Sequence, residues 1–193
     1  MTSLMGMEIA ADDLRVIGKD AFFWTSIRSL YLSGDSVEIQ EGAFRYSSVH
    51  SLQIAAKNVI IAENGFKDSE KIMDMLVLPD LTKDICNFLK NGNGAKQLAF
   101  TNVSAGQFEK ILKENGGADL MEKADAVYVP FAREELSDPD LLEDSNVFYQ
   151  GEWHLVRYMM QNHAEEIYAV RDGETCPQPG MADVYSYPPI GTV

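Results

Sequence analysis

The sequence predicts an α/β fold: a repeating solenoid on a ladder of parallel strands, with helical connections in the later coils and a C-terminal cap. Two observations predict it. A six-residue pattern returns at a constant spacing, and short runs of alternating apolar residues return at the same spacing. Composition agrees, because 46% hydrophobic and 24% charged residues are typical of a globular protein of 193 residues.

The recurring pattern joins an isoleucine to a small residue and a phenylalanine. It reads IGKDAF at 17–22, IQEGAF at 39–44 and IAENGF at 61–66, with an offset of 22 residues between copies. Between the copies, Leu30-Tyr31-Leu32 matches Leu52-Gln53-Ile54 at the same offset. Self-similarity at a period of 20 to 50 residues is the signature of a repeat architecture, and 22 lies in the range of leucine-rich repeats.

Each unit has a physical interpretation. In Leu30-Tyr31-Leu32 the two leucines face one side of a short strand while the middle residue faces the other. The small residue before each phenylalanine allows close approach of neighbouring turns, and the rings of Phe22, Phe44 and Phe66 are expected to fill the space between coils. One unit cannot bury its apolar face alone, so neighbouring units must stack.

The Ile-x-x-x-Ala-Phe signature followed by Leu-x-x-Leu-x-Leu spacing resembles the BspA-like, or Treponema pallidum-type, leucine-rich repeats. The resemblance covers about Asp13 to Pro79. It implies a curved solenoid used for attachment to proteins or ligands, often on bacterial surfaces.

Beyond Pro79 the pattern predicts two further coils whose connections are helices. Residues 80–90 form an amphipathic pattern with Asp80 as the expected N-cap, and residues 104–115 form another, capped by Ser104 and ended by Gly116-Gly117. Residues 97–101 and 126–129 are predicted to be strands. The predicted domains are a solenoid over 12–130 and an acidic C-terminal cap or extension over 131–193.

The cap allows several structures. Residues 134–144 are predicted to be helical with an interruption at Pro139. Residues 147–150 and 153–158 fit a hairpin, although 155–170 fit a helix equally well. The tail from Cys176 is predicted to be extended on the body or disordered.

Charge restricts the partners. The net charge is −14, of which residues 131–193 carry −9 with 12 acidic and three basic side chains. Direct nucleic-acid binding needs cationic groups, so this balance opposes it, whereas a basic protein surface would be attracted. The N-terminal residues fit neither a signal peptide nor a membrane span, which favours a cytoplasmic protein with no membrane partner.

No constellation of residues predicts catalysis, a metal site or a cofactor. The three histidines, His50, His154 and His163, lack metal-ligand spacing. Cys86 and Cys176 are expected to be free thiols, and Cys176 has no neighbouring base or second cysteine in the sequence. The acidic pairs, including Glu134-Glu135 and Glu165-Glu166, fit solvated faces, and the NGNG run at 91–94 fits a turn.

The outward positions of the strands therefore remain as the predicted protein-binding surface. One position from each coil, with Trp153 from the acidic part, gives the set Tyr31, Gln53, Val77, Ala99, Tyr128 and Trp153. The sequence favours a non-enzymatic protein-binding scaffold. Alternatives are an acidic inhibitor or nucleic-acid mimic that occludes a basic groove, and a bacterial surface adhesin.

Overall fold

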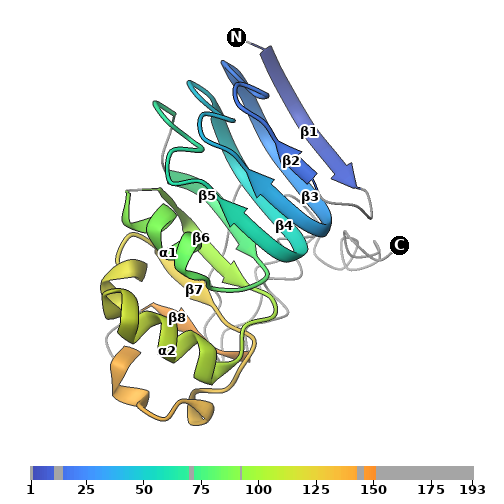
Figure 1. Ribbon diagram of the computed structural model, residues 1–193. Helices are drawn as coiled ribbons and strands as arrows, with labels where there is room; N and C mark the ends of the chain where they lie inside the picture. The colour runs from blue at the N-terminus through green and yellow to red at the C-terminus, as the bar shows by residue number, and fades with distance from the viewer. Residues whose placement is uncertain (1, 11–14, 70–71, 92, 143–145, 151–193) are drawn as a thin grey trace, which may run out of the picture.

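A computed structural model describes residues 2–10, 15–69, 72–91, 93–142 and 146–150 (Figure 1). These residues form an α/β structure around one eight-stranded sheet in which the paired strands run parallel. The sheet order is β1-β3-β4-β5-β6-β7-β8, with β2 paired beside the far end of β3. The strands are β1 (Thr2–Ala10), β2 (Arg15–Ile17), β3 (Thr25–Ile39), β4 (Ser48–Ile61), β5 (Ile72–Leu78), β6 (Gly94–Phe100), β7 (Ala126–Tyr128) and β8 (Val147–Phe148).

The strands pair in the register that the repeat predicts. Leu30 lies opposite Leu52, and Leu52 lies opposite Leu76, so the inward-facing leucines form one continuous row. The members of this row are at most 2% exposed and belong to the hydrophobic core. The ladder also begins before residue 12, because β1 pairs with β3 and places Leu4 beside Ile27.

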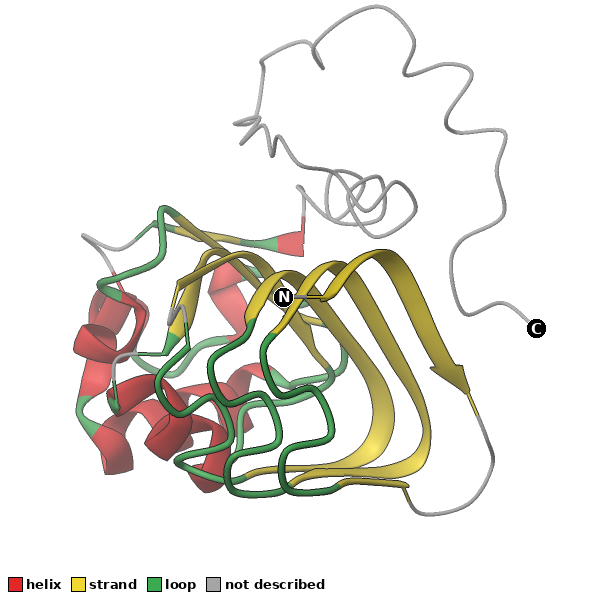
Figure 2. Cartoon of the chain, turned by 90° about the horizontal axis from the view of Figure 1, so that it is seen from above, coloured by secondary structure: helices red, strands yellow, loops and turns green. Residues whose placement is uncertain are grey.

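The turns after β2, β3 and β4 are stacked on one another and joined by backbone hydrogen bonds. Seen from above, they follow similar paths from one coil to the next (Figure 2). Backbone hydrogen bonds link them: the Phe22 amide donates to the Ala43 carbonyl at 2.9 Å, and the Phe44 amide donates to the Gly65 carbonyl at 2.9 Å. The small residue is needed at this point, since a Cβ on Gly65 would lie 3.1 Å from the Ala62 carbonyl oxygen.

The later connections are helical, as expected. Helix α1 (Lys83–Lys90) and helix α2 (Ala105–Asn115) lie together at the β6–β7 end of the sheet (Figure 1). Ser104 caps α2 and Gly116 ends it in a left-handed conformation with φ 115°, which confirms both predicted signals.

The predicted N-cap of α1 is wrong. Thr82 caps this helix by accepting a hydrogen bond from the Ile85 amide. The Asp80 carboxylate instead accepts from the Leu81 amide at 2.7 Å and from the Gln107 side chain at 2.6 Å. Asp80 therefore contacts the second helical connection through Gln107, and α1 begins later than predicted, at Lys83.

Among the described residues after β7, the helical segments are short. They are the 3-10 turns η2 (Arg133–Glu135) and η3 (Pro139–Leu142), separated as the interruption at Pro139 predicts. β8 then adds to the sheet in parallel beside β7, so the ladder continues past residue 130. The predicted alternatives for 153–158 and 155–170, and the tail from Cys176, lie outside the described residues. In the described part of the chain, no helix has the length and apolarity needed to cross a membrane.

Candidate functional site

The five predicted ladder residues do form one row across the sheet. Tyr31 pairs with Gln53, Gln53 with Val77, Val77 with Ala99, and Ala99 with Tyr128. Their expected exposure is wrong, because all five side chains are at most 6% exposed. The alternation of the strands fixes which face a side chain occupies, but it does not say what covers that face. Trp153, the sixth predicted residue, lies outside the described residues.

The exposed aromatic residues lie instead on the turns. Phe23, Trp24 and Tyr46 are 42%, 57% and 51% exposed, and Arg45 lies among them. The Phe23 ring meets the Trp24 and Tyr46 rings edge-on, with centroids 6.2 and 5.9 Å apart. We call Phe23, Trp24, Arg45 and Tyr46 the aromatic–arginine cluster.

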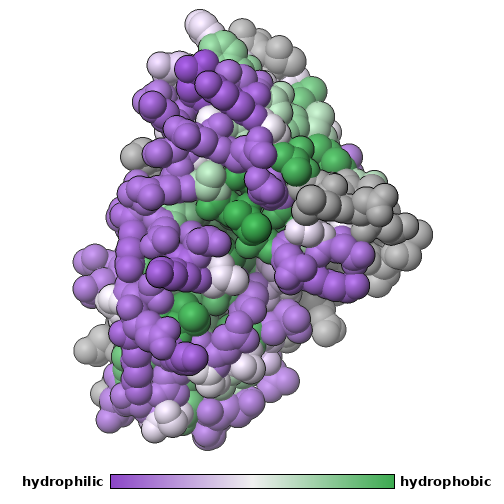
Figure 3. Space-filling model, in the orientation of Figure 1, coloured by the Kyte–Doolittle hydropathy of each residue, from purple (hydrophilic) through white to green (hydrophobic). Residues whose placement is uncertain are grey.

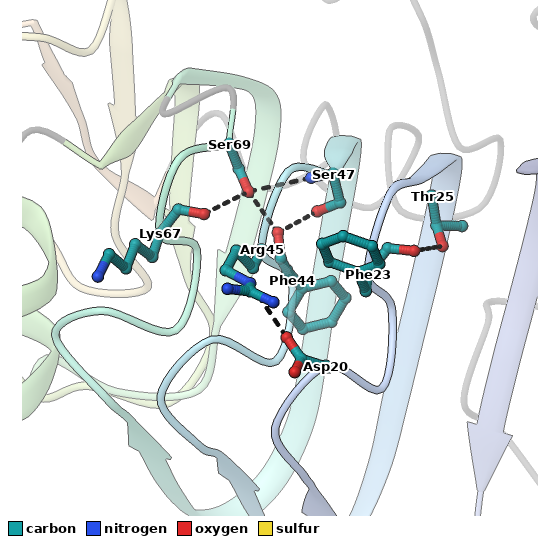
Figure 4. Close-up of polar contacts among 8 residues, drawn as sticks. All are labelled: Asp20, Phe23, Thr25, Phe44, Arg45, Ser47, Lys67 and Ser69. Carbon is teal, nitrogen blue, oxygen red and sulfur yellow. Dashed lines mark hydrogen bonds and ion pairs between the residues drawn. The ribbon is translucent and has the colours of Figure 1, made fainter. Parts of the chain in front are cut away.

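Arg45 holds the cluster together. Its guanidinium carbon lies 5.0 Å from the centroid of the Phe23 ring and 5.6 Å from that of the Tyr46 ring. Its Nε lies 3.1 Å from a carboxylate oxygen of Asp20 on the preceding turn (Figure 4). A cation over aromatic faces is attracted by the ring quadrupole, so the rings and the guanidinium restrict one another before any partner binds.

The backbone under the two most exposed rings is strained. Trp24 and Tyr46 adopt φ of 54° and 55°, a region that bulky L-residues rarely occupy. They occupy equivalent positions in successive coils, and the third coil has Asp68 there with φ 58°. Aspartate tolerates this conformation far better than an aromatic residue. The turn geometry therefore favours a small polar residue at a position where two coils have large aromatic ones.

The hydrogen bonds of the turns keep this backbone in place. The amide of Trp24 donates to the Arg45 carbonyl at 3.1 Å, and that of Tyr46 donates to the Lys67 carbonyl at 3.3 Å. Hydroxyl groups one residue further along bind turn carbonyls: Ser47 and Ser69 both donate to the Phe44 carbonyl (Figure 4). The cluster is thus supported by a rigid, hydrogen-bonded frame.

Comparison with known proteins gives no match. No family model, curated protein or solved structure matches this chain. The resemblance to BspA-like repeats therefore stays a prediction that rests on the repeat and its spacing.

A second exposed apolar area contains aliphatic residues only. Val16 and Ile60 are 46% and 47% exposed, and Glu38 pairs with both, which separates them. Figure 3 shows, on the face that it draws, a group of hydrophobic residues near the middle of a mostly hydrophilic surface. This area lacks the aromatic contacts and the fixed cation of the aromatic–arginine cluster.

The described residues contain one cysteine, Cys86, and one histidine, His50. They contain no group of three or more His, Cys, Asp or Glu side chains placed to hold a metal ion. Cys86 is a buried free thiol, and burial raises its pKa to about 11, which opposes a nucleophilic role. His50 lies 3.3 Å from Asp74 at the surface, while His154, His163 and Cys176 lie outside the described residues.

A signal for the cluster was present in the sequence. The predicted motif ends at the phenylalanine of each copy, but the 22-residue spacing continues through the next two positions, Phe23-Trp24, Arg45-Tyr46 and Lys67-Asp68. At the second of these positions, two successive coils have an aromatic residue, Trp24 and Tyr46, and the third coil has Asp68. Their positive φ, by contrast, can be seen only in the structure.

Proposed function

We propose that the chain is a leucine-rich-repeat solenoid that binds another protein, without catalysis, through the aromatic–arginine cluster. The observation that carries this proposal is the strained, exposed placement of Trp24 and Tyr46. An aromatic residue at such φ costs stability on the order of 1–3 kcal/mol, and the fold gains little from rings that remain half-exposed. Such outliers are found where a surface is selected for recognition.

The chemistry of the cluster supports a protein partner. Trp, Tyr and Arg are the residues most enriched among those that dominate binding energy at protein interfaces. Here all three types lie side by side on a frame that is already ordered, so little conformational entropy would be lost on binding. The strained turns and the stacked coils support one extended recognition surface along the turn side of the molecule.

The decisive experiment removes the rings without disturbing the backbone. A double variant with Trp24→Asn and Tyr46→Asn keeps a residue type that tolerates positive φ, and Asp68→Asn provides the matched control in the next coil. Each full-length protein is used as bait in a lysate of the source organism, and captured proteins are quantified by mass spectrometry. The affinity of the leading partner is then measured with purified proteins.

We expect the double variant to lose the partner and Asp68→Asn to keep it. The double variant should fold with a free energy of unfolding within about 1 kcal/mol of the native chain, because relief of strain offsets the lost ring contacts. A double variant that retains the partner at native affinity would refute this surface. The alternatives of an acidic inhibitor and of a surface adhesin stay predictions, since the acidic segment lies largely outside the described residues.

A further inference from the structure

The sheet has an open edge at β1. β1 is the outermost strand, and among the described residues no strand pairs with its outer side (Figure 1). The first turn is open on the same side. In the next coil the Gln40 amide donates to the Ile17 carbonyl and the Ala43 carbonyl accepts from the Phe22 amide. Within the described part of the chain, the equivalent groups of the first turn, the Gly18 amide and the Ala21 carbonyl, make no such bond.

The apolar side chains at this end are less buried than their neighbours in the next coil. Four of them, three in β1 and one in the first turn, pack against the core but stay only partly buried. The residues that lie directly against them in the next coil are at most 2% exposed. The four pairs are Leu4 with Ile27, Met7 with Leu30, Ile9 with Leu32, and Phe22 with Phe44. The difference shows that no further layer covers this end of the core.

β1 also lacks the features that usually protect an edge strand. Natural edge strands are commonly short, or they carry lysine, proline or a bulge that prevents pairing with another chain. The nine residues of β1 include one charged side chain, Glu8, and no lysine or proline. Gly6 is exposed, and a Cβ there would meet nothing within 4 Å. Another strand can therefore approach the edge without a steric or ionic barrier.

We propose that this end binds a second copy of the chain, with β1 of one protomer antiparallel to β1 of its partner. Around a two-fold axis identical edges complement each other, because each backbone hydrogen bond is made twice. In a pairing centred on Met7, Glu8 lies opposite the partner's Gly6, so like charges do not meet. The described residues of the first coil, 2–10 and 15–24, number 19. Standard interfaces use about 20–30 residues a side, so this coil end is large enough for a stable dimer.

The two ends of the sheet do not suit a head-to-tail contact. β8, at the other end, has two residues, whereas β1 has nine. The stacked turns of the first coils also have no equivalent after β7, where the described residues form the 3-10 turns η2 and η3. Because the two ends differ in this way, a closed dimer is expected rather than an open filament.

The test measures the mass of the full chain by light scattering during size-exclusion chromatography. It extends to about 100 μM, above the micromolar upper end of the dissociation constants of standard-size interfaces. Gly6→Lys with Glu8→Lys places lysines opposite one another across the proposed pair. Asn58→Lys with Glu63→Lys makes the same change in charge at exposed positions away from β1 and is the matched control. Hydrogen exchange of the β1 amides locates the contact.

We expect the mass of two chains for the native protein and the control, and of one chain for the β1 variant with native circular dichroism. The β1 amides should exchange more slowly in the native dimer than in the variant, and the β4 amides equally in both. If the double variant does not fold, Gly6→Glu, which opposes the partner's Glu8, replaces it. A monomeric native chain, a series of larger oligomers, or a dimer that survives the β1 charges would overturn the proposal.

This inference does not rest on the proposed function. It uses the outer edge of the first coil, and none of its variants changes a residue of the aromatic–arginine cluster. A monomeric native chain would leave partner capture by the cluster intact, and a double variant of Trp24 and Tyr46 that keeps its partner would leave the dimer intact. The two proposals can therefore fail separately.

Discussion

Glu109 of α2 is a buried carboxylate that binds two parts of the chain. Its oxygen atoms accept hydrogen bonds from Lys113 Nζ at 2.7 Å and from the amide and hydroxyl of Ser137 at 2.8 and 2.6 Å. Lys113 also lies 3.1 Å from the Asp138 carboxylate. The hydrogen bond from Lys113, followed by those from Ser137, lowers the pKa of Glu109 to about 2.

This lowered pKa predicts how stability depends on pH. A carboxyl whose pKa is lower in the folded than in the unfolded chain stabilises the fold above its unfolded pKa, about 4.5, and loses that contribution as the pH falls toward 2. Glu109→Gln should lower the melting temperature at neutral pH and weaken the fall in stability between pH 4.5 and 2. Thermal unfolding across that range measures both effects, and exposed Glu114→Gln is the control. Equal pH profiles for Glu109→Gln and the native chain would contradict this role.

At the residue scale, the sequence identified side chains that pack by pattern. Phe44 and Phe66 are buried as expected, and Phe22 packs against the core partly buried. It did not identify Glu109, because its partner Ser137 is 28 positions away, in a segment without a repeat pattern. It also assigned exposure to the wrong residues: Tyr128 is buried, whereas Trp24 is exposed. Periodicity gives the direction of a side chain but not the cover over it.

At the element scale, the stacked turns are joined by a column of rings. Phe22 and Phe44 stack with centroids 4.9 Å apart and planes within 8°, and Phe44 and Phe66 stack at 4.6 Å and 3°. Phe88 of α1 continues the column, with its ring tilted by 60° from that of Phe66. The helix thus replaces the turn of the earlier coils but keeps an aromatic residue at the matching position.

The middle ring should contribute most to stability. Phe44 is fully buried and stacks on both sides, so Phe44→Ala should destabilise the fold by about 3–5 kcal/mol. Phe22 is only partly buried and has one stacked neighbour, so Phe22→Ala should cost clearly less. Equilibrium denaturation in urea compares the two. Equal losses would mean that the column does not act as a continuous element.

Strands and helices were predicted to different degrees. The strands β3 and β4 and helix α2 follow from periodicity and capping residues. β1 was missed because it precedes the first copy of the motif and pairs at an offset of 23 residues, as in Leu4 with Ile27. The start of α1 was placed too early because Asp80, a good N-cap type, binds the Gln107 side chain instead. Tertiary contacts decided these two cases.

At the scale of the whole molecule, the sheet has a weak joint between its two most extensively paired parts. Among the described residues, β3 and β4 share twelve residue pairs and β5 and β6 share six, but β4 and β5 between them share three, as few as β6 shares with β7. The cause is a change in the coil: β4 continues to Ile61, whereas the chain leaves β5 at Leu78 to enter α1. Asp74 of β5 reinforces the joint, lying 3.3 Å from His50 of β4 and 2.7 Å from Lys96 of β6.

Stability should therefore divide at this joint. In native-state hydrogen exchange with low denaturant, we expect the amides of β3 and β4 to form one group and those of β5 and β6 another. Partial burial raises the pKa of Asp74, but hydrogen bonds from Lys96 and His50 outweigh this effect and lower it, so the side chain stays charged near neutral pH. Asp74→Asn should separate the two groups further, and Asp35→Asn, which breaks an ion pair with Lys57 between β3 and β4, should not. One common exchange free energy for all strands would argue against a joint.

The constant register of the first coils also has a consequence for evolution and design. Strand pairs, turn hydrogen bonds and stacked rings all repeat at the same spacing, as in Ser26 with Ser48 and Ser47 with Ser69. A copy of one whole coil placed between β3 and β4 would meet the same neighbours on both sides as the coils already there. The molecule could therefore grow or shrink by duplication or deletion of single modules. Each added module would bring one more position equivalent to Trp24 and Tyr46, at which a new recognition residue could be chosen.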